Sequence, residues 1–165
     1  ELFEDRAAVT RRIPLAEAGR HHLRIGPLSP LVSERAISFP GGARDPEDSD
    51  LLTTALRESQ EEMGIHPRDV KVLGTLDDVV TSSGFVITPF VGTIPYPYPF
   101  SPFAEEIEEV LEVPLSALIA GEKVIASGPG RLGVGYEYQY NSHIIWGATA
   151  KIVAQFLRVA LGNEK

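Results

Sequence analysis

Residues 39–65, FPGGARDPEDSDLLTTALRESQEEMGI, are the most informative stretch of this sequence. A proline and two glycines predict a tight turn, in which glycine permits positive φ and a close backbone approach. An acid-rich loop follows. The next segment predicts a helix over residues 51–63, because Ser49 or Asp50 suits its N-cap and Gly64 suits its C-terminal stop. Carboxylates crowd both the loop and the helix, and clustered like charges repel one another unless a cation is bound.

A helical wheel separates a buried arc of this helix from its acidic side. The buried arc holds Leu51, Leu52, Ala55, Leu56, Ser59 and Met63. Glu58 and Glu62 stack one turn apart at the edge of that arc. Glu61 lies nearer the solvent, with Arg57 at salt-bridge spacing. Magnesium takes oxygen ligands and uses one or two carboxylates plus substrate phosphates, so Glu58 and Glu62 are candidate ligands. Taken alone, a glutamate-rich helix is more often only a solvated face.

Composition limits the class of protein. The 165 residues are 43% hydrophobic, which suits one globular domain with a core. A net charge of −8 without a basic stripe argues against a nucleic-acid partner, and no stretch has the apolar length to span a membrane. The absence of cysteine excludes disulfides and thiolate sites, and we expect a cytoplasmic protein. An acidic protein meets an anionic substrate through a bridging cation, which favours a divalent metal.

The remaining pattern predicts a single mixed α/β domain over residues 1–165. Strands are expected at residues 36–39, 70–76, 85–94, 108–113, 136–140 and 143–146, with residues 7–14 and 21–25 as further candidates. Helices are expected at residues 115–120, ended by Gly121, and at residues 148–161.

Two other segments are read as loops. The run PYPYPFSP at residues 95–102 predicts a stiff surface loop, with a polyproline II recognition segment as the alternative. Residues 127–135 predict a mobile loop or hairpin and lack the Gly-Lys-Ser/Thr ending of a P-loop. The helix at residues 148–161 and the loop at residues 95–102 are candidate homodimer surfaces, although core packing and a rigid loop explain them more simply.

The combined pattern resembles the Nudix box of the Nudix hydrolases. The general form is G-x5-E-x7-R-E-U-x-E-E-x-G-U, with U aliphatic, and residues 42–65 follow it with two departures. The gap from Gly42 to Arg57 is one residue longer, and Ser59 occupies an aliphatic position. The longer gap resembles the coenzyme A pyrophosphatase branch, as do ITPFVGTI at residues 87–94, EEIEEVLEVPLSAL at residues 105–118 and IIWGATAKI at residues 144–152.

This resemblance implies an α/β/α sandwich with a mixed central sheet, and a hydrolase that cleaves a nucleoside diphosphate derivative with Mg²⁺ or Mn²⁺. Glu58 and Glu62 match the family's metal ligands, and Gly42 matches a glycine whose carbonyl approaches the metal. Glu61 matches a further ligand or a base that activates water. Arg57 matches the arginine that orients the glutamates. Glu106 aligns with an additional acid, and an ordinary solvated acid is an equal alternative.

The segment upstream of residue 39 departs from the coenzyme A branch. That branch carries L-L-T-x-R-S-x3-R-x3-G-x3-FPGG, whereas this chain has His22-Leu23-Arg24-Ile25-Gly26-Pro27, then Leu31 and Arg35. Neither arginine of the signature is in place. His21, His22, Arg24 and Arg35 are substitutes, or ordinary surface residues. Coenzyme A is the leading substrate, giving 3′,5′-ADP and 4′-phosphopantetheine. NADH or ADP-ribose is the rival, and a non-catalytic nucleotide-binding module is a third interpretation.

Overall fold

The computed structural model describes residues 15–19, 37–81, 84–105, 107, 109–125 and 135–162. The candidate strands at residues 7–14 and 21–25 lie outside these ranges, as do Glu106 and most of the loop predicted at residues 127–135. A strand at residues 15–19 falls between the two candidates and was missed.

A four-stranded sheet forms the centre of the fold, in the order β2-β1-β6-β3. Strand β1 (Leu15–Gly19) pairs in parallel with β2 (Gly41–Ala43) and antiparallel with β6 (Phe90–Thr93). Strand β3 (Lys71–Thr75) pairs antiparallel with β6. The sheet is therefore mixed, as the sequence predicted.

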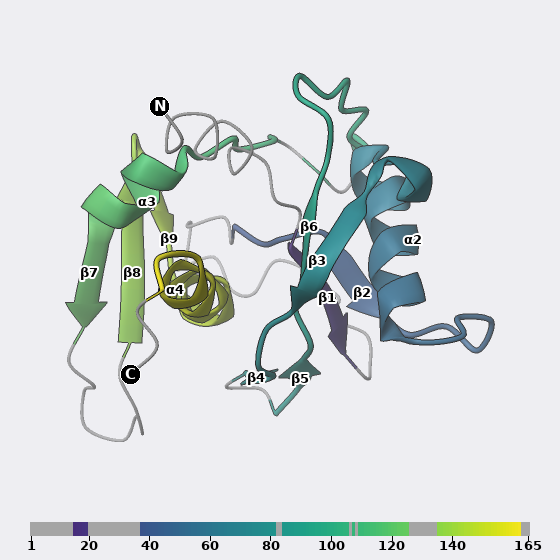
Figure 1. Cartoon of the computed structure of the whole chain (residues 1–165), viewed down its shortest axis with the longest axis horizontal. Coiled ribbons are helices and arrows are strands. Elements are labelled where there is room, and N and C mark those ends of the chain that lie inside the picture. The colour runs from purple at the N-terminus through teal and green to yellow at the C-terminus, as the bar shows by residue number, and fades with distance from the viewer. Residues whose placement is uncertain are drawn as a thin grey trace.

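Two helices cover this sheet from opposite sides (Figure 1). Helix α2 (Leu51–Met63) lies over β1 and β2, while α4 (Gly147–Ala160) lies on the other face. Ile152 of α4 packs with Val79, Ile87 and Val91 to form a core cluster beneath the sheet. The α/β/α arrangement is confirmed.

A second sheet lies on the far side of α4 (Figure 1). It is antiparallel and consists of β7 (Glu122–Ile125), β8 (Gly135–Tyr140) and β9 (His143–Ile145), with α3 (Leu115–Gly121) leading into it. The core between this sheet and α4 contains Tyr138, Ile145, Ala150, Val153, Ala154 and Leu157. Helix α4 is thus packed on both sides, which explains its run of small and aliphatic residues.

Three strand predictions need correction. Residues 37–39 are not a strand, because the backbone that pairs with β1 begins two residues later, at Gly41. Residues 85–94 form two strands rather than one. Strand β5 (Val86–Ile87) pairs with β4 (Val79–Val80), and the chain passes through Pro89, which lacks a ladder donor, before β6 begins.

The third correction concerns residues 108–113. The described part, residues 109–113, is irregular, and Val113 packs against the α4 core without joining a sheet. The apolar residues of this segment are partly buried against the core, and this burial, not pairing in a sheet, accounts for the pattern that predicted a strand.

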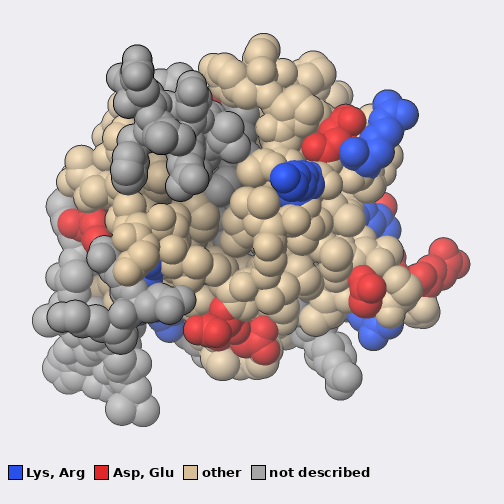
Figure 2. Space-filling model, in the orientation of Figure 1, with Lys and Arg blue, Asp and Glu red and all other residues tan. Residues whose placement is uncertain are grey.

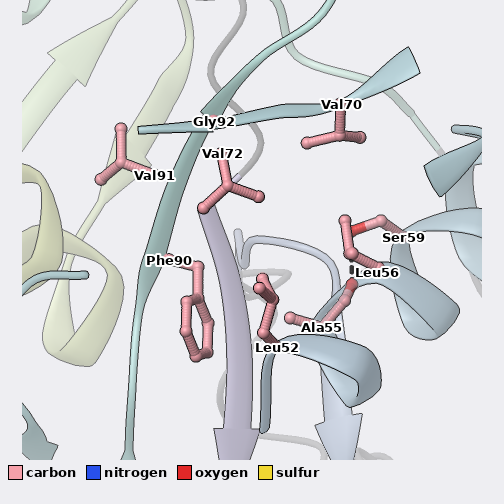
Figure 3. Close-up of a pocket in the computed structure, with 9 residues that line it drawn as sticks. All are labelled: Leu52, Ala55, Leu56, Ser59, Val70, Val72, Phe90, Val91 and Gly92. Atoms are coloured by element: carbon pink, nitrogen blue, oxygen red, sulfur yellow. Dashed lines mark hydrogen bonds between the residues drawn. The ribbon is translucent and has the colours of Figure 1, made fainter. Parts of the chain in front are cut away.

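The predicted buried arc of α2 is confirmed in part: Ala55 and Ser59 are buried, while its other members are half-buried. Thr54, outside the predicted arc, is fully buried. Figure 3 shows Leu52, Ala55, Leu56 and Ser59 facing Val70, Val72, Phe90 and Gly92 across an apolar pocket between the helix and the sheet. Ser59 is 2% exposed, and its hydroxyl donates to the Ala55 carbonyl at 2.7 Å. The serine that replaces the family's aliphatic residue therefore satisfies its hydroxyl within its own helix and leaves the pocket unfilled.

The proline-rich segment is a surface loop, as predicted, and it is anchored to α2. The backbone N–H of Ser101 donates to the Met63 carbonyl at 3.1 Å, and that of Phe103 donates to the Glu62 carbonyl at 2.9 Å. The Tyr98 hydroxyl donates to Asp69 at 2.9 Å, within the short 3₁₀ helix η1 (Pro67–Asp69). The bonds from Ser101 and Phe103 satisfy carbonyls that the end of α2 leaves without intrahelical partners. Among the described residues, no helix is long and apolar enough to cross a membrane.

Candidate active site

Capping residues at both ends set the bounds of α2. The Asp50 side chain accepts the Thr53 backbone N–H at 2.7 Å and the Thr53 hydroxyl at 2.8 Å, so Asp50 is the N-cap. Gly64 adopts the left-handed conformation, with φ 70°, and its N–H donates to the Gln60 carbonyl. The predicted bounds, residues 51–63, are therefore confirmed, and the glutamates lie in the second half of the helix.

Arg57 is the centre of the charged network on this helix. Its Nη1 donates to Glu58 at 2.9 Å and to Glu61 at 3.0 Å. Its Nε and Nη2 donate to the two oxygens of Asp48 at 3.2 and 3.1 Å, and Nη2 also reaches the Ala43 carbonyl at 3.2 Å. The guanidinium thus joins the loop, strand β2 and the helix, and these carboxylates raise its pKa.

Asp48 is the important residue that sequence reasoning overlooked. Its side chain is only 5% exposed and accepts bonds from Arg57, from the Asp45 backbone N–H at 3.0 Å and from the Thr54 hydroxyl at 2.9 Å. The hydrogen bonds from Arg57 are the main reason that its pKa falls to about 2. The spacing from Gly42 could have identified Asp48 in the sequence. Asp48 is the sixth residue after Gly42, where the general pattern of the Nudix box has its first glutamate.

The longer gap therefore lies between Asp48 and Arg57, where Ser49 precedes the helix and Asp50 caps it. Arg44 closes the same loop by donating to the Asp48 carbonyl at 2.8 Å and to the Ser49 carbonyl at 2.8 Å. Acidic and basic groups accordingly lie side by side over the loop before α2 (Figure 2).

The three glutamates occupy different environments. The Glu58 side chain is 16% exposed, and burial is the main reason that its pKa rises, an effect that Arg57 partly opposes. Glu61 is 59% exposed and is held by Arg57. Glu62 is half-buried. The predicted boundary position of Glu58 and Glu62, and the outward position of Glu61, are both confirmed.

Gly42 lies against Glu58. It sits inside strand β2, without the positive φ that the sequence suggested, so the expected glycine turn is wrong. The sequence did correctly predict that another group would approach the backbone closely at Gly42. A Cβ atom at Gly42 would overlap the Glu58 carboxyl group, with Oε2 at 2.9 Å. Any larger residue here would displace that carboxylate, which is the physical reason for glycine at this position.

The donor set suits a hard divalent cation with few protein ligands. The oxygens near Gly42 belong to carboxylates and backbone carbonyls, which is the ligand chemistry of magnesium. Within the described ranges, no three acidic or histidine side chains already converge on one point. Arg57 instead holds one oxygen each of Glu58 and Glu61. Such a site fits an ion that keeps waters and takes further ligands from substrate phosphates.

The remaining candidates are not placed. Glu106, His21, His22, Arg24 and Arg35 all lie outside the described residues, so the second acid and the upstream basic groups stay predictions.

Comparison with known proteins agrees with the motif. Residues 20–121 match the family model described as NUDIX domain. The chain is 38% identical over 122 residues to an uncharacterized Nudix hydrolase NudL from Photorhabdus laumondii, covering 72% of this chain and 65% of that protein. It is also 38% identical over 120 residues to proteins of the same name from Yersinia pestis and Yersinia pseudotuberculosis, covering 71% of this chain and 60% of each. The chain thus spans less than two thirds of the length of these relatives.

Proposed function

This chain belongs to the Nudix hydrolase family, and we propose that it cleaves the pyrophosphate bond of a nucleoside diphosphate derivative. The observation that carries the proposal is the position of Glu58 and Glu61, held by Arg57 beside the Gly42 backbone. Arg57 offsets part of the repulsion between these carboxylates, and it leaves the second oxygen of each one available to a metal ion.

The proposed substrate is coenzyme A or an acyl derivative, with 3′,5′-ADP and 4′-phosphopantetheine as products. Support comes from the lengthened gap after Gly42 and from the resemblance over residues 87–94, 105–118 and 144–152. The relatives named NudL are uncharacterized and do not decide the substrate. The altered residues upstream of residue 39 keep NADH and ADP-ribose as alternatives.

The metal would be held by Glu58, Glu62 and the Gly42 carbonyl, with Glu61 as a further ligand or as the base. Nudix hydrolases use divalent ions, and we propose Mg²⁺ or Mn²⁺ here. When bound, the ion would neutralise phosphate oxygens and favour deprotonation of water.

The residues of the chain would supply orientation and proton transfer. Arg57 stays charged and holds Glu58 and Glu61 at fixed positions, while Asp48 fixes Arg57. In the reaction, a water oxygen bonds to phosphorus, the bridging P–O bond breaks, and the leaving phosphate takes the electron pair. A carboxylate accepts the proton of the water, and Glu61 or Glu106 is the proposed acceptor.

The test is hydrolysis of coenzyme A, NADH, ADP-ribose and a diadenosine polyphosphate, with and without Mg²⁺ or Mn²⁺. Metal-dependent cleavage of coenzyme A above the others would support the proposed substrate. Preferred cleavage of another compound would support the family chemistry and change the substrate.

The variant Glu62→Gln is the control for the metal assignment. We expect its turnover to fall at least about a hundredfold while its thermal unfolding stays close to wild type. Activity equal to wild type would remove Glu62 from the metal site.

A nucleotide-binding module without catalysis is the second candidate, favoured only by the altered upstream residues. Folded protein that binds Mg²⁺ and hydrolyses none of the four compounds would support that reading. We also propose that residues 1–165 form one domain that acts in the cytoplasm on a small molecule. Any homodimer would use the loop at residues 95–102 or the exposed side of α4, which includes Val159.

A further inference from the structure

The loop at residues 95–102, together with Phe103, lies over the end of α2 that carries Glu62 (Figure 1). The two segments are in close contact. A Cβ atom at Gly64 would lie 2.9 Å from the Ser101 Cβ atom and 3.1 Å from the Ser101 backbone nitrogen. The loop therefore packs directly on the backbone that ends the helix, and glycine at position 64 leaves the room that this contact needs.

The last turn of α2 depends on this loop for two of its backbone hydrogen bonds. The helix cap at Gly64 satisfies carbonyls of earlier residues. The carbonyls of Glu62 and Met63 instead accept the N–H groups of Phe103, at 2.9 Å, and Ser101, at 3.1 Å. Carbonyls at a helix end have no intrahelical donor, and helix ends fray when nothing holds them. The loop thus fixes the turn on which Glu62 lies.

Tyr98 anchors the loop on its other side. Its hydroxyl donates to the Asp69 carboxylate at 2.9 Å and accepts the His66 backbone N–H at 2.9 Å. Its ring contacts that of Phe100, with the ring centroids 5.5 Å apart. Both partners of the hydroxyl belong to the segment that follows α2, so Tyr98 ties the loop to the chain as it leaves the helix.

We propose that this loop positions Glu62 for metal binding, with Tyr98 as its anchor and the Phe103 N–H as its contact. This inference rests on the proposed role of Glu62 as a metal ligand. Arg57 donates to the carboxylates of the other two candidate glutamates, whereas the loop acts on Glu62 through its backbone. Groups that orient a metal ligand change metal affinity without touching the ion. Tyr98 and Phe103 are therefore positioning residues.

The first test is Tyr98→Phe, which removes only the hydroxyl. Electron paramagnetic resonance of free Mn²⁺ measures metal affinity without substrate, and NMR measures hydrogen exchange at the Ser101 and Phe103 amides. We expect both amides to exchange faster and Mn²⁺ affinity to fall about tenfold, the lower end of the loss when groups that orient a metal ligand are removed. Tyr140→Phe makes the same change on β8 and should alter neither quantity. Wild-type Mn²⁺ affinity in Tyr98→Phe would overturn the role of the anchor.

A proline at position 103 tests the contact itself. Phe103→Pro removes the N–H that donates to Glu62, and we expect Mn²⁺ affinity to fall about tenfold in protein whose melting curve shows that it is folded. Ala104→Pro is the matched control, because the bonds from the loop to α2 do not use the Ala104 N–H. It should keep wild-type affinity. An equal loss in both variants would overturn the role of the Phe103 bond.

The variant Glu62→Gln, in the same titration, separates this inference from the proposed function. Weak Mn²⁺ binding by Glu62→Gln, with wild-type binding by Tyr98→Phe and Phe103→Pro, would keep the metal site and overturn only the role of the loop. Wild-type binding by Glu62→Gln would overturn both the metal assignment and the inference built on it.

Discussion

At the scale of single residues, one arginine organises the candidate site. Arg57 bonds to carboxylates on the loop and on the helix, and to a strand carbonyl. The motif alone predicted its contact with Glu61, because both residues are on one helix at fixed spacing. The contact with Asp48 depends on how the loop folds back, so periodicity could not reveal it.

The first prediction concerns Asp48→Asn and acid stability. The Asp48 pKa is lowered in the folded protein, so its contribution to stability is complete above its unfolded value and is lost as pH falls from about 4 to about 2. We expect Asp48→Asn to melt at a lower temperature than wild type near pH 7, with the difference shrinking over that acid range. Melting curves measured by circular dichroism at several pH values check this. Asp77→Asn, at an exposed position, is the control, and a constant difference at all pH values would contradict the expectation.

The second prediction concerns Glu58→Gln. Burial raises the Glu58 pKa, so above that pKa the charged form makes folding less favourable. Without metal, we expect the variant to melt at the wild-type temperature or a few degrees higher. Wild type should gain stability from Mg²⁺ by mass action, and the variant should not.

Differential scanning calorimetry with EDTA and with excess Mg²⁺ measures both effects. Glu47→Gln, in the exposed loop, should behave as wild type in the two conditions. A metal-free Glu58→Gln protein that melts well below wild type would mean that the bond from Arg57 outweighs the burial cost.

At the scale of the element, α2 combines an intact acidic side with an incompletely filled apolar side. Its ends followed from caps and part of its buried arc followed from periodicity, since both are local properties of the sequence; the burial of Thr54 did not. The pocket beside Ser59 did not, because its size depends on residues of β3 and β6 that are distant in the chain.

The third prediction is that Ser59→Val stabilises the protein. The added methyl groups face Leu56, Val72 and Phe90, and filling an apolar gap typically gains about 1 kcal/mol. Chemical denaturation should show a higher midpoint with an unchanged slope. Gln60→Val, on the exposed side of the helix, is the control and should not stabilise. A lower midpoint for Ser59→Val would indicate that the pocket is too tight for a branched side chain.

At the scale of the whole molecule, α4 joins the two sheets. Ala150, Val153, Ala154 and Leu157 pack against β8 and β9, while Ile152 packs against β4, β5 and β6. Small residues, Ala150 and Ala154, lie on the side of the helix that faces β8 and β9.

The fourth prediction is that Ala150→Leu destabilises both layers together. Ala150 is fully buried, and overpacking of such a site costs about 1–3 kcal/mol. Thermal unfolding followed by tryptophan fluorescence and by circular dichroism should shift equally in both signals. Val159→Leu, at a position 58% exposed, should leave the melting temperature nearly unchanged. Separate transitions in Ala150→Leu would mean that the two sheets unfold independently.

The sequence by itself determined the helix at residues 51–63, the positions of its glutamates, and the family, because caps, 3.6-residue periodicity and motif spacing are all local along the chain. Only the tertiary structure decided that Gly42 lies in a strand against Glu58, that Asp48 holds Arg57, and that residues 85–94 divide at Pro89. These features depend on pairing and packing between different segments of the chain. The free energy of such a contact depends on the residues of both segments, so it cannot be inferred from the local pattern of either one.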